Sequence, residues 1–204
     1  MDADPDYRAD VVYQGVPGAF SEDAARQLLA MVGGHVDATL VGVPTLDSVG
    51  IALANGLARY AVVPVCNSIA GTVPGADAIV QLAGARVDAT LDMPIRQCLV
   101  APTGTTLSKV RRVVSHPVAL DQCRRFLTAR PWLRTEPHHD TSGALAMLIE
   151  SSASGAAAIA SERAADIWGG VVLKRDIQDH ADNVTTFVLI SRDPRANRTG
   201  LLAV

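Results

Sequence analysis

The sequence predicts an α/β protein with two lobes, mixed sheets and a cleft between the lobes. Apolar runs rich in β-branched residues alternate with helix-like segments along most of the 204 residues, which is typical of layered α/β folds. The alternation changes once, where two strand-like runs at 85–92 and 96–100 are separated only by Met93-Pro94-Ile95. So short a link indicates either an antiparallel strand pair or a chain that crosses between lobes.

The first alternating series forms the first predicted lobe. A turn at 15–18 joins its first strand to its first helix, and we expect Ser21 to be the N-cap of that helix, with Glu22 and Asp23 in the first turn. The predicted strands are 10–14, 38–43 and 59–65, and the predicted helices are 21–31 and 45–54.

The second series forms the second predicted lobe. Its predicted strands are 110–115, 134–138, 156–160 and 171–174, its predicted helices are 119–129, 141–150 and 161–168, and a last strand covers 185–191. We therefore expect a first lobe from residues 10–84 and 178–204, a second lobe from 85–177, and a flexible tail at 1–9.

Composition limits the partners of this chain. A net charge of −3, no Lys/Arg-rich run and only 4% aromatic residues argue against nucleic acid or an anionic membrane. No apolar stretch approaches the roughly 20 residues of a membrane span, and the acidic N-terminus is unlike a signal peptide. Three widely spaced cysteines suit free thiols in a reducing compartment. We expect a cytoplasmic protein.

Adjacent His138, His139 and Asp140 are the best candidates for metal ligands. Neighbouring residues on a strand point to opposite faces and rarely bind one ion. We therefore predict that the protein has no metal site.

Polar residues gather at four places, each with two interpretations. The segment 15–21 presents either backbone N–H groups to an anion or a tight turn with a helix cap. Asn67 and Ser68 follow an apolar strand and either bind a ligand or cap a helix. Ser115 before His116-Pro117 is better explained as a cap than as a nucleophile. The segment 179–187 is either a solvated loop or a group of titratable side chains.

Taken together and in order, five segments resemble the prephenate dehydratase family, with a similar likeness to arogenate dehydratase. The likeness covers residues 11–191. The segments are YQGVPGAFSEDAA, VVPVCNSIAGTV, VVSHPVALDQCRRFL with DTSGALAML, AAIASERAADIWG and IQDHADNVTTF.

This resemblance implies two α/β lobes like those of periplasmic ligand-binding proteins, with the active site between them. It implies a carbon–oxygen lyase that converts prephenate, a dicarboxylate, to phenylpyruvate with loss of water and carbon dioxide, without a cofactor. The family's polar catalytic groups fall on Asn67, Gln122 and Thr185, and relatives are homodimers or larger. The expected substrate-binding residues are Gly18, Ala19, Phe20, Ser21, Ser68, Ser115, His116, Thr186 and Phe187, although Phe187 is better suited to packing beneath Thr185.

Two departures from the family pattern affect charge. Thr186 stands where the family has Arg, and Cys66 stands where it usually has Glu. We expect that the two missing side chains would have faced each other as an ion pair, which requires positions 66 and 186 to lie within about 10 Å, Cα to Cα. If the family's Arg instead binds the substrate, then this chain, with Thr186 at that position, binds the substrate carboxylate more weakly or through other residues.

The expected region is the catalytic one alone, because only Arg192 to Val204 follow the last strand, where many relatives carry a regulatory ACT domain. Two alternatives to a dehydratase stay open. One is a diverged enzyme that decarboxylates prephenate without aromatising it, and the other is an inactive ligand-binding relative. The presence of Thr185 favours the dehydratase.

Overall fold

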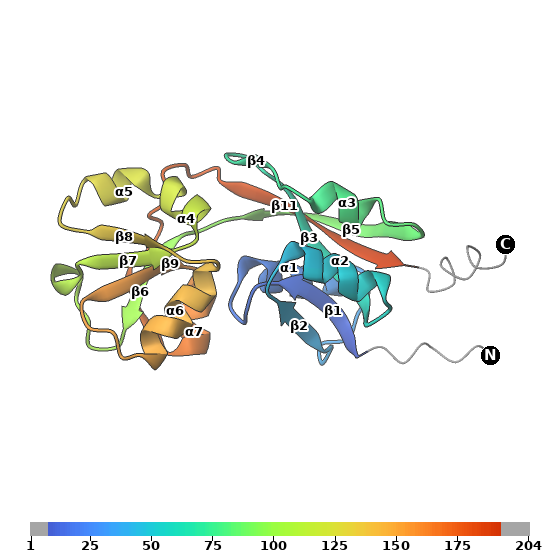
Figure 1. The fold of residues 1–204 in the computed structure, drawn as a ribbon, viewed down its shortest axis with the longest axis horizontal. Helices are drawn as coiled ribbons and strands as arrows, with labels where there is room; N and C mark the ends of the chain where they lie inside the picture. The colour runs from blue at the N-terminus through green and yellow to red at the C-terminus, as the bar shows by residue number, and fades with distance from the viewer. Residues whose placement is uncertain (1–7, 193–204) are drawn as a thin grey trace.

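The computed structural model describes residues 8–192, which form two lobes side by side, each built on one mixed sheet covered by helices (Figure 1). The predicted α/β class, the two lobes and the mixed sheets are confirmed. Within the described residues, no helix is long and apolar enough to cross a membrane.

The sheet of the first lobe has the order β2-β1-β3-β11-β5, with β4 paired to β3. Its first three strands are parallel, whereas β11 runs antiparallel to both β3 and β5. The strands are β1 (Ala9–Gln14), β2 (Leu40–Val43), β3 (Ala58–Asn67), β4 (Gly71–Thr72), β5 (Ala85–Pro94) and β11 (Val184–Arg192).

Helices cover both faces of this sheet. One face packs on α1, and the other packs on α2 and α3. The helix α1 buries Ala24, Ala25, Leu28 and Leu29, which share one helical face. The helices are α1 (Phe20–Met31), α2 (Leu46–Ala54) and α3 (Ala76–Val80).

The start of α1 differs from the prediction. The helix begins one residue earlier than expected, and its N-cap is Ala19 rather than Ser21. Ala19 makes no side-chain cap hydrogen bond. Instead, the Glu22 carboxylate in the first turn reaches back and accepts a hydrogen bond of 2.7 Å from the N–H of Gly18, the residue before the N-cap.

The sheet of the second lobe has the order β10-β6-β9-β7-β8. All five residues of its central strand β9 are buried, because helices cover both faces. The strands are β6 (Cys98–Pro102), β7 (Arg112–Ser115), β8 (Arg134–Pro137), β9 (Ala156–Ala160) and β10 (Gly170–Lys174), and the helices are η1 (Leu107–Lys109), α4 (Pro117–Gln122), α5 (Arg124–Thr128), α6 (Thr141–Glu150) and α7 (Glu162–Trp168).

The helix predicted over 119–129 is divided at Cys123 into α4 and α5. A residue from a distant loop binds both sides of this break. Asp179 donates its N–H to the carbonyl of Gln122 (2.6 Å), and its carboxylate accepts from the Arg125 N–H (2.9 Å). These contacts cap both short helices and fix the position of Gln122.

The lobe boundary expected at residue 85 is wrong, because β5 pairs with β11 along its whole length and belongs to the first sheet. The chain therefore crosses at 95–97 and returns at 175–183. These two segments lie side by side, as shown by the hydrogen bonds Ile95 N–H to Asn183 O (2.8 Å) and Ile177 N–H to Gln97 O (2.9 Å). Of the expected tail at 1–9, residues 1–7 lie outside the described residues, and Ala9 is the first residue of β1 rather than part of a tail. The C-terminal part of the first lobe after residue 192 also lies outside the described residues.

The turn between β1 and α1 contacts the second lobe through several hydrogen bonds. The Ser142 hydroxyl donates to the Pro17 carbonyl (2.6 Å), and the Ser161 hydroxyl donates to the Gly18 carbonyl (2.8 Å). Ser161 also caps α7, and Asp140, which caps α6, accepts from Val16 N–H at 3.2 Å. Helix caps of one lobe thus bind the turn of the other.

Gly18 fits this contact only because it lacks a side chain. Its φ is +88°, and an added Cβ would meet the Ala164 Cα at 2.7 Å and the Ser142 Oγ at 2.8 Å. Gly33 has a similar φ of +74° but nothing within 4 Å of an added Cβ. Both glycines have a positive φ, which disfavours other residues, but only at Gly18 would an added side chain also collide with its neighbours.

We predict that Gly18→Ala lowers the free energy of unfolding by about 2 kcal/mol or more, combining left-handed strain with overpacking. The matched control Gly33→Ala carries the strain alone and should lose about 1 kcal/mol. Thermal unfolding monitored by circular dichroism measures both. Equal losses in the two variants would contradict the role of Gly18 in the contact between lobes.

Candidate active site

A cleft of about 590 Å³ lies between the two lobes. Its walls come from the ends of β3 and β11 in the first lobe and from α4 in the second. Segments that are distant in the sequence therefore meet where the two lobes face each other. Seven of the expected site residues line the cleft: Phe20, Ser21, Asn67, His116, Gln122, Thr185 and Phe187.

The Thr185 hydroxyl is held in a defined orientation by Asn67. The two residues are cross-strand partners in β3 and β11, and the Asn67 Nδ2 lies 2.9 Å from the Thr185 Oγ1. The same nitrogen lies 2.8 Å from the Asn183 Oδ1 and 3.1 Å from the Val184 carbonyl, so its two hydrogens are shared among three acceptors, of which Asn183 and Thr185 are the nearer two. Because Thr185 receives an N–H from Asn67 and has no acceptor for its own proton within residues 8–192, that proton is available to a ligand.

The orientation of the Asn67 amide is set by the backbone. Its Oδ1 accepts hydrogen bonds from the N–H groups of Ile69 (3.0 Å) and Ala70 (2.8 Å), which can only donate. The oxygen therefore faces this turn, and the nitrogen faces Thr185. Asn67 does not cap a helix, because it is the last residue of β3 and the next helix, α3, has Gly75 as its N-cap; its side chain lines the cleft.

Two glutamines extend this network across the cleft. The Gln122 Nε2 lies 3.4 Å from the Asn67 Oδ1, and the Gln97 Nε2 lies 3.3 Å from the Gln122 Oε1. Asn67, Gln122 and Thr185 are therefore parts of one hydrogen-bonded chain that joins the lobes.

Among residues 8–192, no Lys, Arg, Asp or Glu side chain lines the cleft. Its one ionisable group is His116, the N-cap of α4, whose Nδ1 accepts from the Val118 N–H at 3.2 Å. Burial lowers the pKa of the His116 imidazole, while the Asp140 carboxylate acts in the opposite direction. The neutral imidazole therefore carries its proton on Nε2, where it is available as a donor.

Five expected residues do not line the cleft: Gly18, Ala19, Ser68, Ser115 and Thr186. Ser115 is fully buried and donates to the Ile159 carbonyl (2.7 Å), so it fastens β7 to β9, and the expected cap role belongs to His116. The Ser68 hydroxyl donates to the Asp182 carbonyl (2.9 Å) and secures the return segment.

The turn at 15–19 does not serve as an anion cradle. Its backbone N–H groups already donate within the protein: Gly15 to Val43 O, Val16 to Asp140, Gly18 to Glu22, and Ala19 to Val16 O. Residues 15–19 therefore form a tight turn that leads into a helix, whereas the N–H groups of Phe20 and Ser21 at the start of α1 have no acceptor within residues 8–192.

Cys66 and Thr186 lie on the face of the strands opposite Thr185. They are direct cross-strand partners in β3 and β11, which places their Cα atoms roughly 4.5–5.5 Å apart. The expected proximity of these two positions is confirmed. The Thr186 hydroxyl donates to the Asp92 carboxylate on β5 (2.6 Å) and points away from Thr185.

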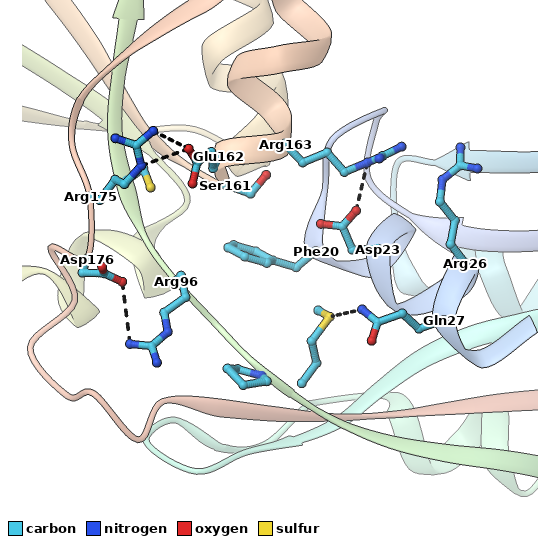
Figure 2. A pocket seen from close by; sticks show the side chains of 13 residues that line it. Phe20, Asp23, Arg26, Gln27, Arg96, Ser161, Glu162, Arg163, Arg175 and Asp176 are labelled. Carbon is cyan, nitrogen blue, oxygen red and sulfur yellow. Dashed lines mark hydrogen bonds and ion pairs between the residues drawn. The ribbon is translucent and has the colours of Figure 1, made fainter. Parts of the chain in front are cut away.

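A second cavity, of about 520 Å³, shares Phe20 with the cleft and is rich in charge (Figure 2). Each of its arginines is already paired with a carboxylate of the protein. The pairs are Arg26 with Glu22 (2.6 Å), Arg163 with Asp23 (2.9 Å) and Glu22 (3.2 Å), Arg96 with Asp176 (3.6 Å), and Arg175 with Glu162 (2.9 Å).

Glu22 and Asp23 of this cavity respond differently to their surroundings. Burial would raise the pKa of Glu22, but hydrogen bonds from the Gly18 N–H and Arg26, with the charge of Arg163, hold it below its ordinary value. Burial raises the pKa of Asp23 to about 6 against the opposing charge of Arg163. Arg163 of α7 pairs with both carboxylates of α1 and therefore holds the lobes together; the cleft is the better candidate for the active site.

No group of three His, Cys, Asp or Glu side chains within residues 8–192 is placed to hold a metal ion. Sequence reasoning missed Gln97, Asn183, Gln14 and Thr141. Gln97, Gln14 and Thr141 line the cleft, and Asn183 is bonded to Asn67. Gln97 lies in the crossing segment and belongs to no motif, so only its contacts reveal it.

Comparison with known proteins agrees with this geometry. Residues 11–195 match the family model described as prephenate dehydratase. The chain is 35% identical over 187 residues to the chloroplastic arogenate dehydratase/prephenate dehydratase 2 of Arabidopsis thaliana, a match that covers 92% of this chain and 47% of that protein. It is 34% identical over 186 residues to the bifunctional N-acyl-homoserine lactone acylase/prephenate dehydratase of Komagataeibacter europaeus, covering 90% and 63%.

Among solved structures, the prephenate dehydratase of Arthrobacter aurescens in complex with L-Phe superposes with a TM-score of 0.77 at 31% identity, over 90% of this chain and 60% of that one. The chain spans about half the length of the plant relatives that it matches. With a family match over almost all of its length, the chain belongs to the prephenate dehydratase family.

Proposed function

We propose that this chain converts prephenate to phenylpyruvate with loss of water and carbon dioxide. The observation that carries the proposal is the Thr185 hydroxyl, which receives an N–H from Asn67 and keeps its proton for a ligand in the cleft. A donor fixed in this way is suited to a leaving hydroxyl group. Asn67 and Gln122 add neutral hydrogen bonds that orient the ring.

The reaction needs one proton and no redox partner. The prephenate dianion takes up a proton and gives the phenylpyruvate monoanion, water and carbon dioxide. The bond from the ring to the hydroxyl and the bond from the ring to its carboxylate both break, and the electron pair of the second bond completes the aromatic ring. A Thr hydroxyl is a weak acid, so Thr185 acts as an oriented hydrogen-bond donor within a polarised network.

Two carboxylates must be bound in a cleft that has no cationic lining. Ser21 in the first turn of α1 and Thr141 in the first turn of α6 both line the cleft. The first N–H groups of a helix lack partners within the helix, and they carry partial positive charge. With the Nε2–H of His116, they offer donors to a dicarboxylate without an arginine.

Arogenate is a second candidate substrate, because relatives that match this chain are described as arogenate dehydratases. It differs from prephenate in one amino group in place of a keto group, and the same ring chemistry would release phenylalanine. Ultraviolet absorbance and mass analysis of the products from each substrate separate these two candidates. A dihydro-hydroxyphenylpyruvate product would instead indicate decarboxylation alone, and binding without turnover would indicate an inactive relative.

We predict that Thr185→Ala lowers kcat by about 10²- to 10⁴-fold, the usual contribution of a placed proton donor. The dissociation constant for substrate should change far less, because the hydroxyl acts mainly as the leaving group departs. Thr185→Ser is the matched control, since it keeps the hydroxyl and should retain most of the rate. An unchanged kcat in Thr185→Ala would remove this residue from the mechanism.

We also predict that Thr186→Arg leaves kcat/KM within about threefold of wild type, since the new side chain faces Asp92 and an exposed ion pair contributes only about 0–1 kcal/mol. Steady-state kinetics with prephenate provides the measurement. Thr186→Val is the control, because it keeps the shape and loses the hydrogen bond to Asp92. A gain of tenfold or more in Thr186→Arg would mean that position 186 reaches the substrate.

A further inference from the structure

Gln97 holds an acceptor for which the protein supplies no donor. The residue lines the cleft from the segment between β5 and β6 and is only 3% exposed. Its Oε1 is buried and has no hydrogen-bond partner within the described part of the chain. Buried polar atoms are rarely left unpaired in folded proteins, so an exception beside a cleft needs a partner from outside the chain, which is either water or a ligand group.

The identity of this free atom follows from the direction of the hydrogen bonds. The N–H groups of Ile69 and Ala70 require the Asn67 oxygen to face them, so Gln122 must present its Nε2 to that oxygen. The Gln122 Oε1 then faces Gln97 and must receive its Nε2. Along this line of residues the oxygen of Gln97 is left without a donor, while the Asn183 Nδ2, on the side chain that also bonds Asn67, is buried without an acceptor. The backbone N–H groups of Ile69 and Ala70, beside Asn67, thus determine that the unpaired atom of Gln97 is its oxygen.

The two ends of this hydrogen-bonded network are complementary to a hydroxyl group of a ligand. Thr185 ends it with a hydroxyl that has a proton to give, and Gln97 ends it with an oxygen that has a proton to receive. A ligand hydroxyl accepts one hydrogen bond and donates another. The ring hydroxyl is the only donor that the prephenate dianion carries, because its carboxylates and keto group only accept.

We propose that the substrate's ring hydroxyl closes this chain into a cycle in which every hydrogen bond runs in the same direction. In the cycle Thr185 donates to the hydroxyl, the hydroxyl donates to Gln97, Gln97 to Gln122, Gln122 to Asn67, and Asn67 to Thr185. Gln97 is then a specificity-determining residue that touches the leaving group. This role rests on the proposed function, since it concerns the hydroxyl that the reaction expels.

The cycle explains two further features of the site. Its links to Gln122 are long, at 3.3 and 3.4 Å, as expected for an active-site chain that tightens only when a ligand completes it. Hydrogen bonds in a closed chain polarise one another, which strengthens the donor character of the Thr185 hydroxyl. The cycle also extends from the crossing segment to α4 and back to β11, so it forms only when the lobes are correctly placed.

The test pairs a change in the protein with a change in the ligand. Two ring-reduced analogues of prephenate are used, one that keeps the ring hydroxyl and one that lacks it, and calorimetry measures their dissociation constants for wild type and Gln97→Leu. We expect the variant to bind the hydroxylated analogue about tenfold or more weakly, the usual effect of losing one buried hydrogen bond. Binding of the deoxy analogue should change by less than about twofold.

Equal losses for both analogues, or no loss for either, would overturn the role of Gln97 while leaving the proposed function intact. If wild type binds neither analogue, the proposed function fails and this role fails with it. Thermal unfolding of Gln97→Leu, measured in parallel, confirms that the folded protein is being compared.

Gln97→Glu provides a second readout that a purely structural residue would not change. When the introduced carboxyl is protonated, it donates to Gln122 and still accepts from the substrate, whereas its ionised form cannot donate. The kcat/KM of this variant, relative to wild type, should therefore fall as pH rises through the pKa of the introduced carboxyl, which burial and the facing Gln122 oxygen raise. A ratio that is independent of pH between 5 and 8.5, roughly the range over which a raised carboxyl titrates, would overturn the cycle.

Gln178→Glu is the matched control for this profile. The side-chain oxygen of Gln178 accepts from the backbone N–H of Gln97 (2.9 Å), and a carboxylate would accept in the same way. The variant therefore adds the same charge nearby without breaking the cycle. Both variants keep the other titratable and charged groups of the neighbouring elements, which are Arg96, Cys98, His116, Cys123, Asp176 and Asp179. A falling pH profile in Gln178→Glu as well would overturn the assignment to Gln97.

Discussion

The hydrogen bonds from the Ile69 and Ala70 N–H groups to the Asn67 oxygen are the constraint on which the site depends. An amide side chain can present either its oxygen or its nitrogen to a neighbour, but a backbone N–H can only donate. This pair therefore removes the ambiguity for Asn67. The Thr185 hydroxyl consequently receives an N–H, and its proton is directed to the ligand rather than into the protein.

The cleft presents neutral donors to the dicarboxylate that we propose as its ligand. Charged side chains are present nearby, but they are used in the second cavity, where arginines pair with Glu22, Asp23 and their neighbours and Arg163 joins α7 to α1. The cleft itself relies on amides, hydroxyls, one neutral imidazole and helix N-termini. Such donors are rigidly placed by the fold, so little reorganisation is needed when charge shifts during the reaction.

Assembly of the cleft depends on how closely the lobes approach. The turn at 15–19 enters between the capped ends of α6 and α7, and Gly18 permits a distance that any side chain would prevent. The loop that carries Asp179 binds both sides of the helix break after Gln122 and fixes that residue on the opposite wall. Packing interactions outside the cleft therefore hold Gln122 within reach of Asn67.

The amino-acid sequence alone determined the α/β class, the two lobes, and Asn67, Gln122 and Thr185 as residues that meet in the cleft, because periodicity and family motifs are written locally along the chain. It also indicated that positions 66 and 186 are neighbours. The predictions from sequence were wrong where they depended on pairing between distant segments, which no local pattern encodes. The pairing of β5 with β11 is the example, because it places 85–94 in the first lobe instead of the second.

Tertiary structure decided which face of a strand each side chain occupies and which polar atoms are already satisfied. Thr186 and Ser115 are next to cleft residues in the sequence, yet the alternation of strand faces and the packing of β7 against β9 direct them elsewhere. Gln97 has no distinguishing neighbours in the sequence. Its importance follows only from a buried oxygen without a partner, which is a property of the folded chain.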